Sequence, residues 1–299
     1  MAAVAAASVI QFFMGQLSQI SVCRGDASDR AEEMWYNSPM KKLALICMTV
    51  ACAVVAGCFD NWGKPADATP ITSLKALAAT NRAEVVRLVL RKDTEPIGED
   101  AFADLPKLEV LDISERKLKK VPSSAFALKT LKHFYLTRNE LETVPDELGK
   151  MTALEYLNLD GNRLASVPAS LAGATSLRWL RLNENKLQVL PSELVALKDM
   201  RRIYLKHNQL AVVPEVVKEW PELEDLLLDA NPIASLPDWV TKLPKLKSVS
   251  LANCKLAKLP DDLSGWRKLD SLVLSGCPIP AEEMQRIRKA LGDDVAVVF

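Results

Sequence analysis

A 23-residue repeat runs through most of the chain and constrains its fold more than any other feature. Successive units open on a regularly spaced apolar residue: Leu108, Leu131, Leu154, Leu177, Met200, Leu223, Leu246 and Leu269. Aligned on these residues, the units read LxxLxLxxNxLxxLPxxLxxLxx, and the unit from Leu154 shows the pattern as LEYLNLDGNRLASVPASLAGATS. A unit this small cannot fold alone, so neighbouring units must stack and bury their leucines in one shared core.

The two halves of each unit predict different backbones. In the first half, LxxLxL alternates apolar and polar residues, which indicates a half-buried strand, and strands of successive units pair in parallel about 4.8 Å apart. The eleventh position adds a buried aliphatic residue: Leu118, Leu141, Leu164, Leu187, Leu210, Ile233, Leu256 and Ile279. The second half carries one proline at a fixed position: Pro122, Pro145, Pro168, Pro191, Pro214, Pro237 and Pro260. Because proline lacks an N–H, this half favours a short helical or 3-10 turn on the outer side.

The pattern resembles the leucine-rich repeat family, whose signature is L-x-x-L-x-L-x-x-N/C-x-L, in its 23-residue LPxxLxxL class. The resemblance covers roughly residues 85–299. It implies an α/β solenoid: a right-handed leucine-rich repeat horseshoe with a parallel concave sheet and terminal helical caps. Proteins of this family are generally recognition scaffolds, so the resemblance also implies a binding function.

The ninth position of each unit implies a ladder of polar side chains inside the solenoid. In the family, an inward Asn or Cys at this position bonds the backbone of adjoining turns, which satisfies groups that would otherwise be buried unpaired. The matching residues are Asn139, Asn162, Asn185, Asn208, Asn231, Cys254 and Cys277. The first unit has Arg116 there instead. We therefore expect the ladder to be open at its N-terminal end, with Arg116 turned to solvent.

Both ends of the repeat region, residues 85–280, need a cap because an open end exposes core. Residues 71–84 are expected to form the N-terminal cap, with a helix over residues 71–83. Residues 281–299 are expected to form the C-terminal cap. Pro280 and the acidic first turn predict a helix over residues 281–291, and VAVVF at the end predicts a closing edge strand.

The N-terminal part of the chain predicts a targeting signal. Residues 40–57 have a basic pair followed by an apolar run of about 15 residues, which is typical of a signal peptide and shorter than the ~20 residues that span a membrane. The VAGC sequence that ends at Cys58 resembles the lipobox of bacterial lipoproteins, which implies lipidation of the Cys58 thiol. A short anchor helix or a chance apolar run are the alternatives. Residues 58–70 then form a polar tether.

Residues 1–39 precede this signal and predict a disordered upstream extension. The start codon, Met1 or Met40, is left open. An Arg-Gly-Asp tripeptide at residues 24–26 is too short a motif to indicate adhesion. Of six cysteines, only Cys254 and Cys277 fall within the repeats. Neighbouring ladder positions bring them within disulfide reach, but two buried thiols are favoured and bridging stays open.

Nothing in the sequence indicates catalysis. The two histidines lie three repeats apart, and no metalloprotease, nucleophile-elbow or phosphate-loop motif is present. The chain carries 38 basic and 38 acidic residues, which gives no reason to expect nucleic acid. We therefore predict a protein that is not an enzyme and needs no cofactor or metal.

The third and fifth positions of each unit point out onto the concave sheet. In the middle units they gather residue types enriched at interface hot spots: His133, Tyr135, Tyr156, Trp179, Arg181, Arg202 and Tyr204. Along the rim the charges are mixed: Arg138, Asp160, Glu184, Lys206 and Asp229. The alternative interpretation is that these large side chains only stabilise cross-strand packing.

The sequence therefore predicts a monomeric lipoprotein of the bacterial cell envelope, lipid-anchored at Cys58 and extracytoplasmic, that binds a protein on its concave face. A module that binds glycan or peptidoglycan through the same aromatic residues is a second hypothesis. A cytoplasmic or exported signalling scaffold is a third, if the lipobox is not used. The identity of the partner, and the membrane or leaflet that holds the anchor, cannot be predicted from the sequence.

Overall fold

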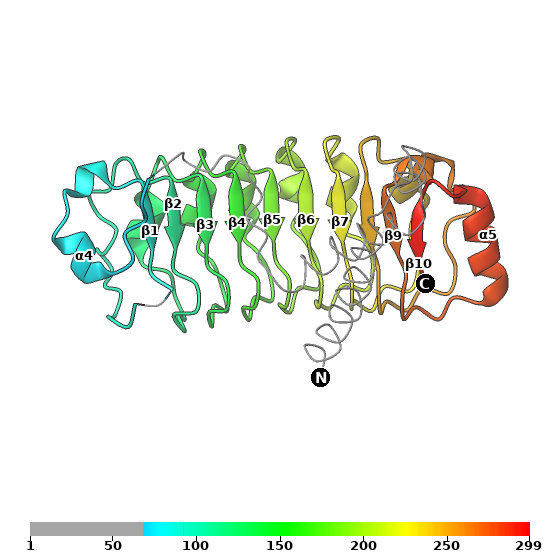
Figure 1. Cartoon of the computed structure of the whole chain (residues 1–299), viewed down its shortest axis with the longest axis horizontal. Coiled ribbons are helices and arrows are strands. Elements are labelled where there is room, and N and C mark those ends of the chain that lie inside the picture. The colour runs from blue at the N-terminus through cyan, green and yellow to red at the C-terminus, as the bar shows by residue number, and fades with distance from the viewer. Residues whose placement is uncertain (1–67, 92) are drawn as a thin grey trace, which may run out of the picture. The chain divides into compact units, whose positions relative to one another are not determined.

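The computed structural model describes residues 68–91 and 93–299, which form one solenoid built on a parallel sheet (Figure 1). The upstream extension, the signal peptide and Cys58 lie outside the described residues. The ten strands of the sheet follow one another in chain order: β1 (Arg87–Val89), β2 (Val110–Asp112), β3 (His133–Tyr135), β4 (Tyr156–Asn158), β5 (Trp179–Arg181), β6 (Arg202–Tyr204), β7 (Asp225–Leu227), β8 (Ser248–Ser250), β9 (Ser271–Val273) and β10 (Ala296–Val298).

The strand register follows the sequence repeat. Leu157 on β4 pairs with Phe134 on β3 and with Leu180 on β5, so each step along the sheet is one 23-residue unit. The central residue of each of these strands points inward and is fully buried, whereas its two neighbours face outward. The predicted parallel-sheet solenoid is therefore confirmed.

The outer side of the solenoid is a row of five-residue 3-10 helices. They are η3 (Ser123–Ala127), η4 (Asp146–Lys150), η5 (Ala169–Gly173), η6 (Ser192–Ala196), η7 (Glu215–Glu219), η8 (Asp238–Lys242) and η9 (Ser264–Lys268). In the first six, the fixed proline is the residue that precedes the helix, as a residue without an N–H allows. In the seventh, η9 begins after Leu263 and so lies three residues further from Pro260.

The N-terminal cap differs from the single predicted helix. It consists of α4 (Leu74–Ala78), with Ser73 as its N-cap, and the short 3-10 helix η2 (Arg82–Glu84). Ile71 is extended and forms a parallel bridge with Leu88. Its N–H donates to the Arg87 carbonyl at 3.0 Å and its carbonyl accepts from Val89 N–H at 2.8 Å. Ile71 is extended because the outer edge of β1 would otherwise lack partners.

The C-terminal cap agrees with the sequence prediction. Helix α5 (Ala281–Leu291) follows Pro280 and ends at Gly292, whose φ is +75°. The helix buries Ile287 and Leu291 against the last repeat. Strand β10 then pairs in parallel with β9. Within residues 68–91 and 93–299, no helix is long and apolar enough to cross a bilayer.

Candidate functional site

The seven predicted binding residues lie on four adjacent strands, β3 to β6. We call them the aromatic–arginine cluster: His133, Tyr135, Tyr156, Trp179, Arg181, Arg202 and Tyr204. Each occupies the first or last residue of its strand, on the side of the sheet opposite the leucine core, and each is half-buried. The backbone register therefore brings together side chains that are up to 71 residues apart in sequence.

The rings of the cluster form a continuous chain of contacts. The ring centroids of Tyr135 and Tyr156 are 4.9 Å apart, and His133 stacks on Tyr156 at 5.9 Å. Tyr156 meets Trp179 edge to face at 4.9 Å and 85°, and Trp179 meets Tyr204 at 5.6 Å and 74°. Edge-to-face geometry at these distances is favourable, so the rings hold one another in place before any partner binds.

Two arginines cover ring faces of the cluster. The Arg202 guanidinium lies 4.8 Å from the centre of the Trp179 ring, and that of Arg181 lies 5.3 Å from the Tyr204 ring. Arg181 also makes an ion pair with Asp160 at 2.6 Å, and Arg202 makes one with Asp225 at 3.0 Å. The guanidinium planes are thus fixed by both rings and carboxylates.

Burial favours the uncharged forms of the histidine and of two tyrosines in the cluster. It raises the pKa of Tyr135 and raises that of Tyr156 to about 12, so both hydroxyls stay protonated at neutral pH. It also lowers the pKa of His133, which favours the uncharged imidazole. The positive charge of the cluster at neutral pH therefore comes from its arginines.

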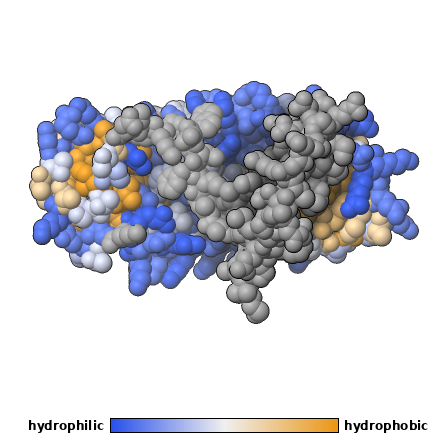
Figure 2. Space-filling model, in the orientation of Figure 1, coloured by the Kyte–Doolittle hydropathy of each residue, from blue (hydrophilic) through white to orange (hydrophobic). Residues whose placement is uncertain are grey.

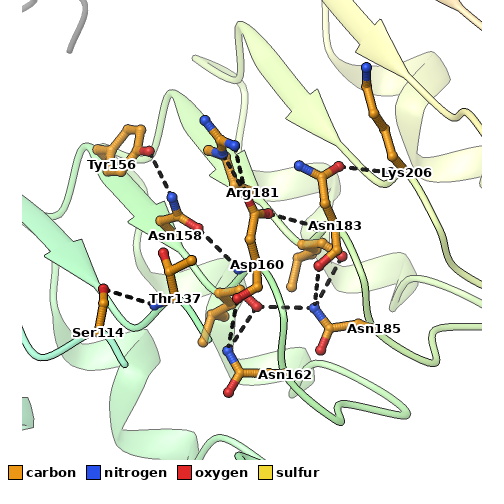
Figure 3. A network of polar contacts seen from close by, with 12 residues as sticks. Ser114, Thr137, Tyr156, Asn158, Asp160, Asn162, Arg181, Asn183, Asn185 and Lys206 are labelled. Carbon is orange, nitrogen blue, oxygen red and sulfur yellow. Dashed lines mark hydrogen bonds and ion pairs between the residues drawn. The ribbon is translucent and has the colours of Figure 1, made fainter. Parts of the chain in front are cut away.

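A polar row beside the cluster was missed in the sequence. At the seventh position of the units, side-chain oxygens accept the backbone N–H of the next unit, as part of the network in Figure 3 shows. Ser114 Oγ accepts from Thr137 at 3.1 Å, Asp160 Oδ1 from Asn183 at 2.8 Å and Asn183 Oδ1 from Lys206 at 2.8 Å. The prevalence of Ser, Thr, Asp and Asn at this position was the available signal.

Two of the charges assigned to the rim belong to this row. Asp160 and Asp229 are buried, and Asp229 Oδ1 accepts from Ala252 N–H at 2.9 Å. Burial raises the pKa of the Asp160 carboxyl, although Arg181 opposes that shift. Asp160 and Asp229 thus join neighbouring units and are not simple solvated rim charges.

The asparagines at the ninth position each join two neighbouring turns of the solenoid. Asn185 Nδ2 donates to the carbonyl of Leu159 at 3.0 Å, in the previous unit, and to that of Leu182 at 3.2 Å. Its Oδ1 accepts from Leu164 N–H at 3.0 Å. The same pattern recurs at Asn139, Asn162, Asn208 and Asn231. These bonds satisfy backbone groups that the sheet and the 3-10 helices leave unpaired.

Cys254 and Cys277 continue the ninth-position ladder of asparagines, with a thiol as a weaker donor. Cys254 Sγ donates to the Leu228 carbonyl at 3.4 Å and Cys277 Sγ to that of Leu251 at 3.1 Å, each 26 residues earlier in the chain. Both are free thiols. Burial raises the pKa of Cys254 to about 11, which keeps it protonated and able to donate.

Arg116 corrects one expectation. It does not turn to solvent: its Nη1 donates to the Leu90 carbonyl at 2.8 Å, and Nη2 donates to the Glu95 carbonyl. Leu90 lies 26 residues earlier, which is the step that the asparagine amides take. The arginine side chain is long enough for its guanidinium to replace the missing amide donor, so Arg116 extends the ninth-position ladder by one unit.

The eighth residue of each unit adopts a left-handed backbone conformation, which the consensus sequence does not indicate. In every unit its φ is between 53° and 73°, in the left-handed region: Glu115, Arg138, Gly161, Glu184, His207, Ala230, Asn253 and Gly276. There the N–H donates to the next unit, as Glu184 does to the Lys206 carbonyl at 2.8 Å. Side chains other than those of Gly and Asn are strained in this conformation.

No group of three or more His, Cys, Asp or Glu side chains that could hold a metal ion occurs within residues 68–91 and 93–299. The aromatic–arginine cluster itself presents rings, hydroxyls and guanidinium groups.

Comparisons with known proteins agree with this architecture. A family model described as "Leucine rich repeat" matches residues 106–164. Among solved structures, an internalin (inlF) of Listeria monocytogenes has 22% identity and a TM-score of 0.62, covering 77% of this chain and 71% of that one. A leucine-rich repeat protein of Leptospira interrogans has 25% identity over 73% of this chain and 67% of its own, with a TM-score of 0.48.

A further similar structure is the ectodomain of the plant receptor kinase GASSHO1/SCHENGEN3 of Arabidopsis thaliana, in complex with CASPARIAN STRIP INTEGRITY FACTOR 2. Its identity is 23%, its TM-score is 0.58, and the match covers 72% of this chain but only 27% of that one. The search of curated proteins gave no match. At these identities the likeness establishes the fold and not the function.

Proposed function

We propose that this chain, which has the leucine-rich repeat fold, binds another protein through the aromatic–arginine cluster on its sheet. The observation that carries the proposal is the cluster itself. Trp, Tyr and Arg are the residues most enriched at interface hot spots, and here they occur at outward positions that the leucine core does not need. We propose no catalytic activity for it.

Preorganisation supports a binding role. The rings contact one another, and Arg181 and Arg202 are each held by a ring and a carboxylate. Side chains already fixed in one conformation lose little entropy when a partner arrives. The Arabidopsis ectodomain, which shares the fold, was solved in complex with CASPARIAN STRIP INTEGRITY FACTOR 2, and this supports a recognition role.

The ring geometry favours a protein partner over a glycan. A sugar stacks on an exposed flat ring face. Trp179 presents its edge or face to Tyr156 and Tyr204 at steep angles, and Arg202 lies over its ring. The surface offered to a partner is thus mixed edges and guanidinium groups, which suits the varied side chains of a protein.

We also propose that the chain is a bacterial lipoprotein held on the extracytoplasmic side of the cell envelope. Support comes from the sequence alone: a basic pair, an apolar run and a lipobox that ends at Cys58. Acylation at two or more sites would give a stable anchor where one chain would not.

The binding proposal is tested by affinity capture from envelope extract. Wild type and a Trp179→Ala, Tyr156→Ala double variant serve as baits, and Ser264→Ala, on η9 at the outer side of the solenoid, is the control. Wild type and the control should retain the same protein, and the double variant should lose it. Trp179→Ala alone should weaken binding roughly 30-fold, which corresponds to about 2 kcal/mol at a central hot spot. Equal capture by the double variant, with its fold intact, would disprove the role of the cluster.

The anchoring proposal is tested with Cys58→Ala. This variant should lose labelling by a palmitate analogue and accumulate as an unprocessed precursor. Cys47→Ala, within the signal, should still be labelled and processed. If Cys58→Ala keeps its membrane retention and its mass, the chain is not a lipoprotein, and a cytoplasmic or exported scaffold becomes the better hypothesis.

A further inference from the structure

The outward side of the sheet is divided into two parts of opposite charge. Counting the second, third, fifth, seventh and eighth positions of the units, the part over β3 to β6 has seven cations and three carboxylates: Lys132, Arg138, Arg178, Arg181, Arg201, Arg202, Lys206, Glu155, Asp160 and Glu184. The part over β7 to β9 has one cation and four carboxylates: Lys247, Glu224, Asp225, Asp229 and Asp270. Two ion pairs, Arg202–Asp225 at 3.0 Å and Lys206–Asp229 at 2.9 Å, join the parts at their border.

The two parts also differ in bulk. Over β3 to β6 the outward strand residues are mostly aromatic rings and guanidinium groups. Over β8 to β10 they are small: Ser248, Ser250, Ser271, Val273, Ala296 and Val298. Figure 2 shows an apolar patch toward the C-terminal end of the solenoid, with hydrophilic surface above it. The part over β3 to β6 is therefore bulky and cationic, whereas beyond it the carboxylates lie mainly on the β7 unit and the small residues on β8 to β10.

These two differences are complementary to each other. A twofold axis parallel to the strands, placed between β6 and β7, turns one copy over so that its sheet faces that of a second copy in reversed strand order. Each of β3 to β6 then lies over one of β10 to β7. The basic unit of β6 meets the acidic unit of β7, and the large residues of β4 and β5 meet the serines of β9 and β8, each contact occurring twice. An interface with this symmetry requires such a self-complementary surface, in which each contact occurs in both directions.

We propose that a second copy of this chain is a partner of the sheet, bound face to face about this axis. The inference rests on the proposed function, since it uses the same cluster and names its occupant, and it replaces the sequence expectation of a monomer. Trp179 and Arg181 on β5 would contact Ser248 and Ser250 on β8 of the other copy.

The available area is sufficient. Eight strands about 4.8 Å apart give a width of about 38 Å, and seven residues along each unit give about 20 Å, or about 800 Å² on each copy. That matches the roughly 800 Å² per partner of a standard stable interface.

The test is a bump-and-hole pair on the full chain, measured in detergent by sedimentation velocity. The wild-type chain should dimerise, and the dimer should weaken as salt is raised because the opposed charges are screened. Ser248→Trp adds a ring where the other copy already places Trp179, so its homodimer should weaken at least 30-fold. Ser264→Trp, on η9 at the outer side, is the matched control and should dimerise as wild type does.

A mixture of two variants tests whether β5 of one copy lies over β8 of the other. Ser248→Trp and Trp179→Ser should form a heterodimer with wild-type affinity, because the new ring fills the new space at one contact while the other contact stays native. Circular dichroism of each variant checks its fold. A monomeric wild-type chain, an unaffected Ser248→Trp dimer, or a mixture that does not recover would each overturn the proposal. A monomeric chain that still captures an envelope protein through Trp179 would leave the proposed function standing.

Discussion

The central part of the solenoid, the units that open at Leu131 to Met200, and its C-terminal part, the units from Leu246 and Leu269, share one backbone but few exposed side chains. The strands pair in the same register in both parts. The central part has asparagine at the ninth position and large residues on the sheet, whereas the C-terminal part has cysteine and serine.

The comparison separates what the fold requires from what it permits. Both parts bury the same leucine positions, and both send a side-chain donor to a carbonyl 26 residues earlier. At the outward positions, in contrast, β8 and β9 pair with small residues, Ser248 and Ser271. They keep the same register as β4 and β5, which carry Tyr156 and Trp179 there. The large residues of the central part are therefore an addition to the fold, which is why we assign them to binding.

The largest expected difference between the parts concerns the ninth position. Asn185→Leu strands the Leu164 N–H and removes one of two donors from each of the Leu159 and Leu182 carbonyls, which keep the bonds from Asn162 and Asn208. It should lower the free energy of unfolding by about 3 kcal/mol, with about 1–3 kcal/mol from the stranded N–H and about 0.5–1.5 kcal/mol from each lost hydrogen bond. Cys254→Ala loses a single thiol hydrogen bond and should cost about 1 kcal/mol. Urea unfolding measures both. Equal losses would mean that the two kinds of rung are equivalent.

A second prediction extends the comparison to the N-terminal end. Arg116→Ala leaves the carbonyls of Leu90 and Glu95 without this donor and should cost about 2 kcal/mol. Arg138→Ala, an exposed arginine whose ion pair with Glu115 is 3.7 Å long, should cost less than about 0.5 kcal/mol. Thermal unfolding of the two variants provides the measurement. A negligible effect of Arg116→Ala would restore the open end expected from the sequence.

A third prediction uses alkaline pH, to which the serine-lined part is insensitive. The pKa of Tyr156 is about 12 in the folded chain and near 10 when exposed, so above pH 10 the unfolded chain loses a proton that the folded chain keeps. Stability is therefore full below pH 10 and falls as the pH rises toward 12. Between pH 9 and 11, Tyr156→Phe should reduce this fall by about 1 kcal/mol. An identical pH profile for wild type and variant would show that Tyr156 is not buried in the cluster.

The smallest expected effect lies at the eighth position. Glu184 has a φ of 55° in the central part, and Glu184→Gly should stabilise the chain by about 0.5–1 kcal/mol because glycine adopts this conformation without strain. Asn253, at the same position in the C-terminal part with a φ of 56°, already tolerates it, so Asn253→Gly should change little. Melting temperatures test the pair, and a loss of stability in Glu184→Gly would contradict the strain argument.

The sequence by itself determined the architecture. The spacing of Leu154, Leu157 and Leu159, repeated every 23 residues, is enough to set the strand, its register and the face that it buries, because period-2 alternation and a shared core leave one arrangement. The seven residues of the cluster could be assigned to one surface for the same reason. The helix over residues 281–291 followed from its flanking Pro280 and Gly292.

Only the tertiary structure decided how individual polar groups are satisfied. Arg116 was expected to point to solvent but donates to the Leu90 carbonyl, which belongs to a residue 26 positions away in the chain. Asp160 was assigned to the rim but is buried against Asn183 and Arg181. The repeat pattern fixes which side of the backbone a residue occupies. The hydrogen bonds that it makes depend on the lengths of side chains in neighbouring units, and those distances exist only once the units have stacked.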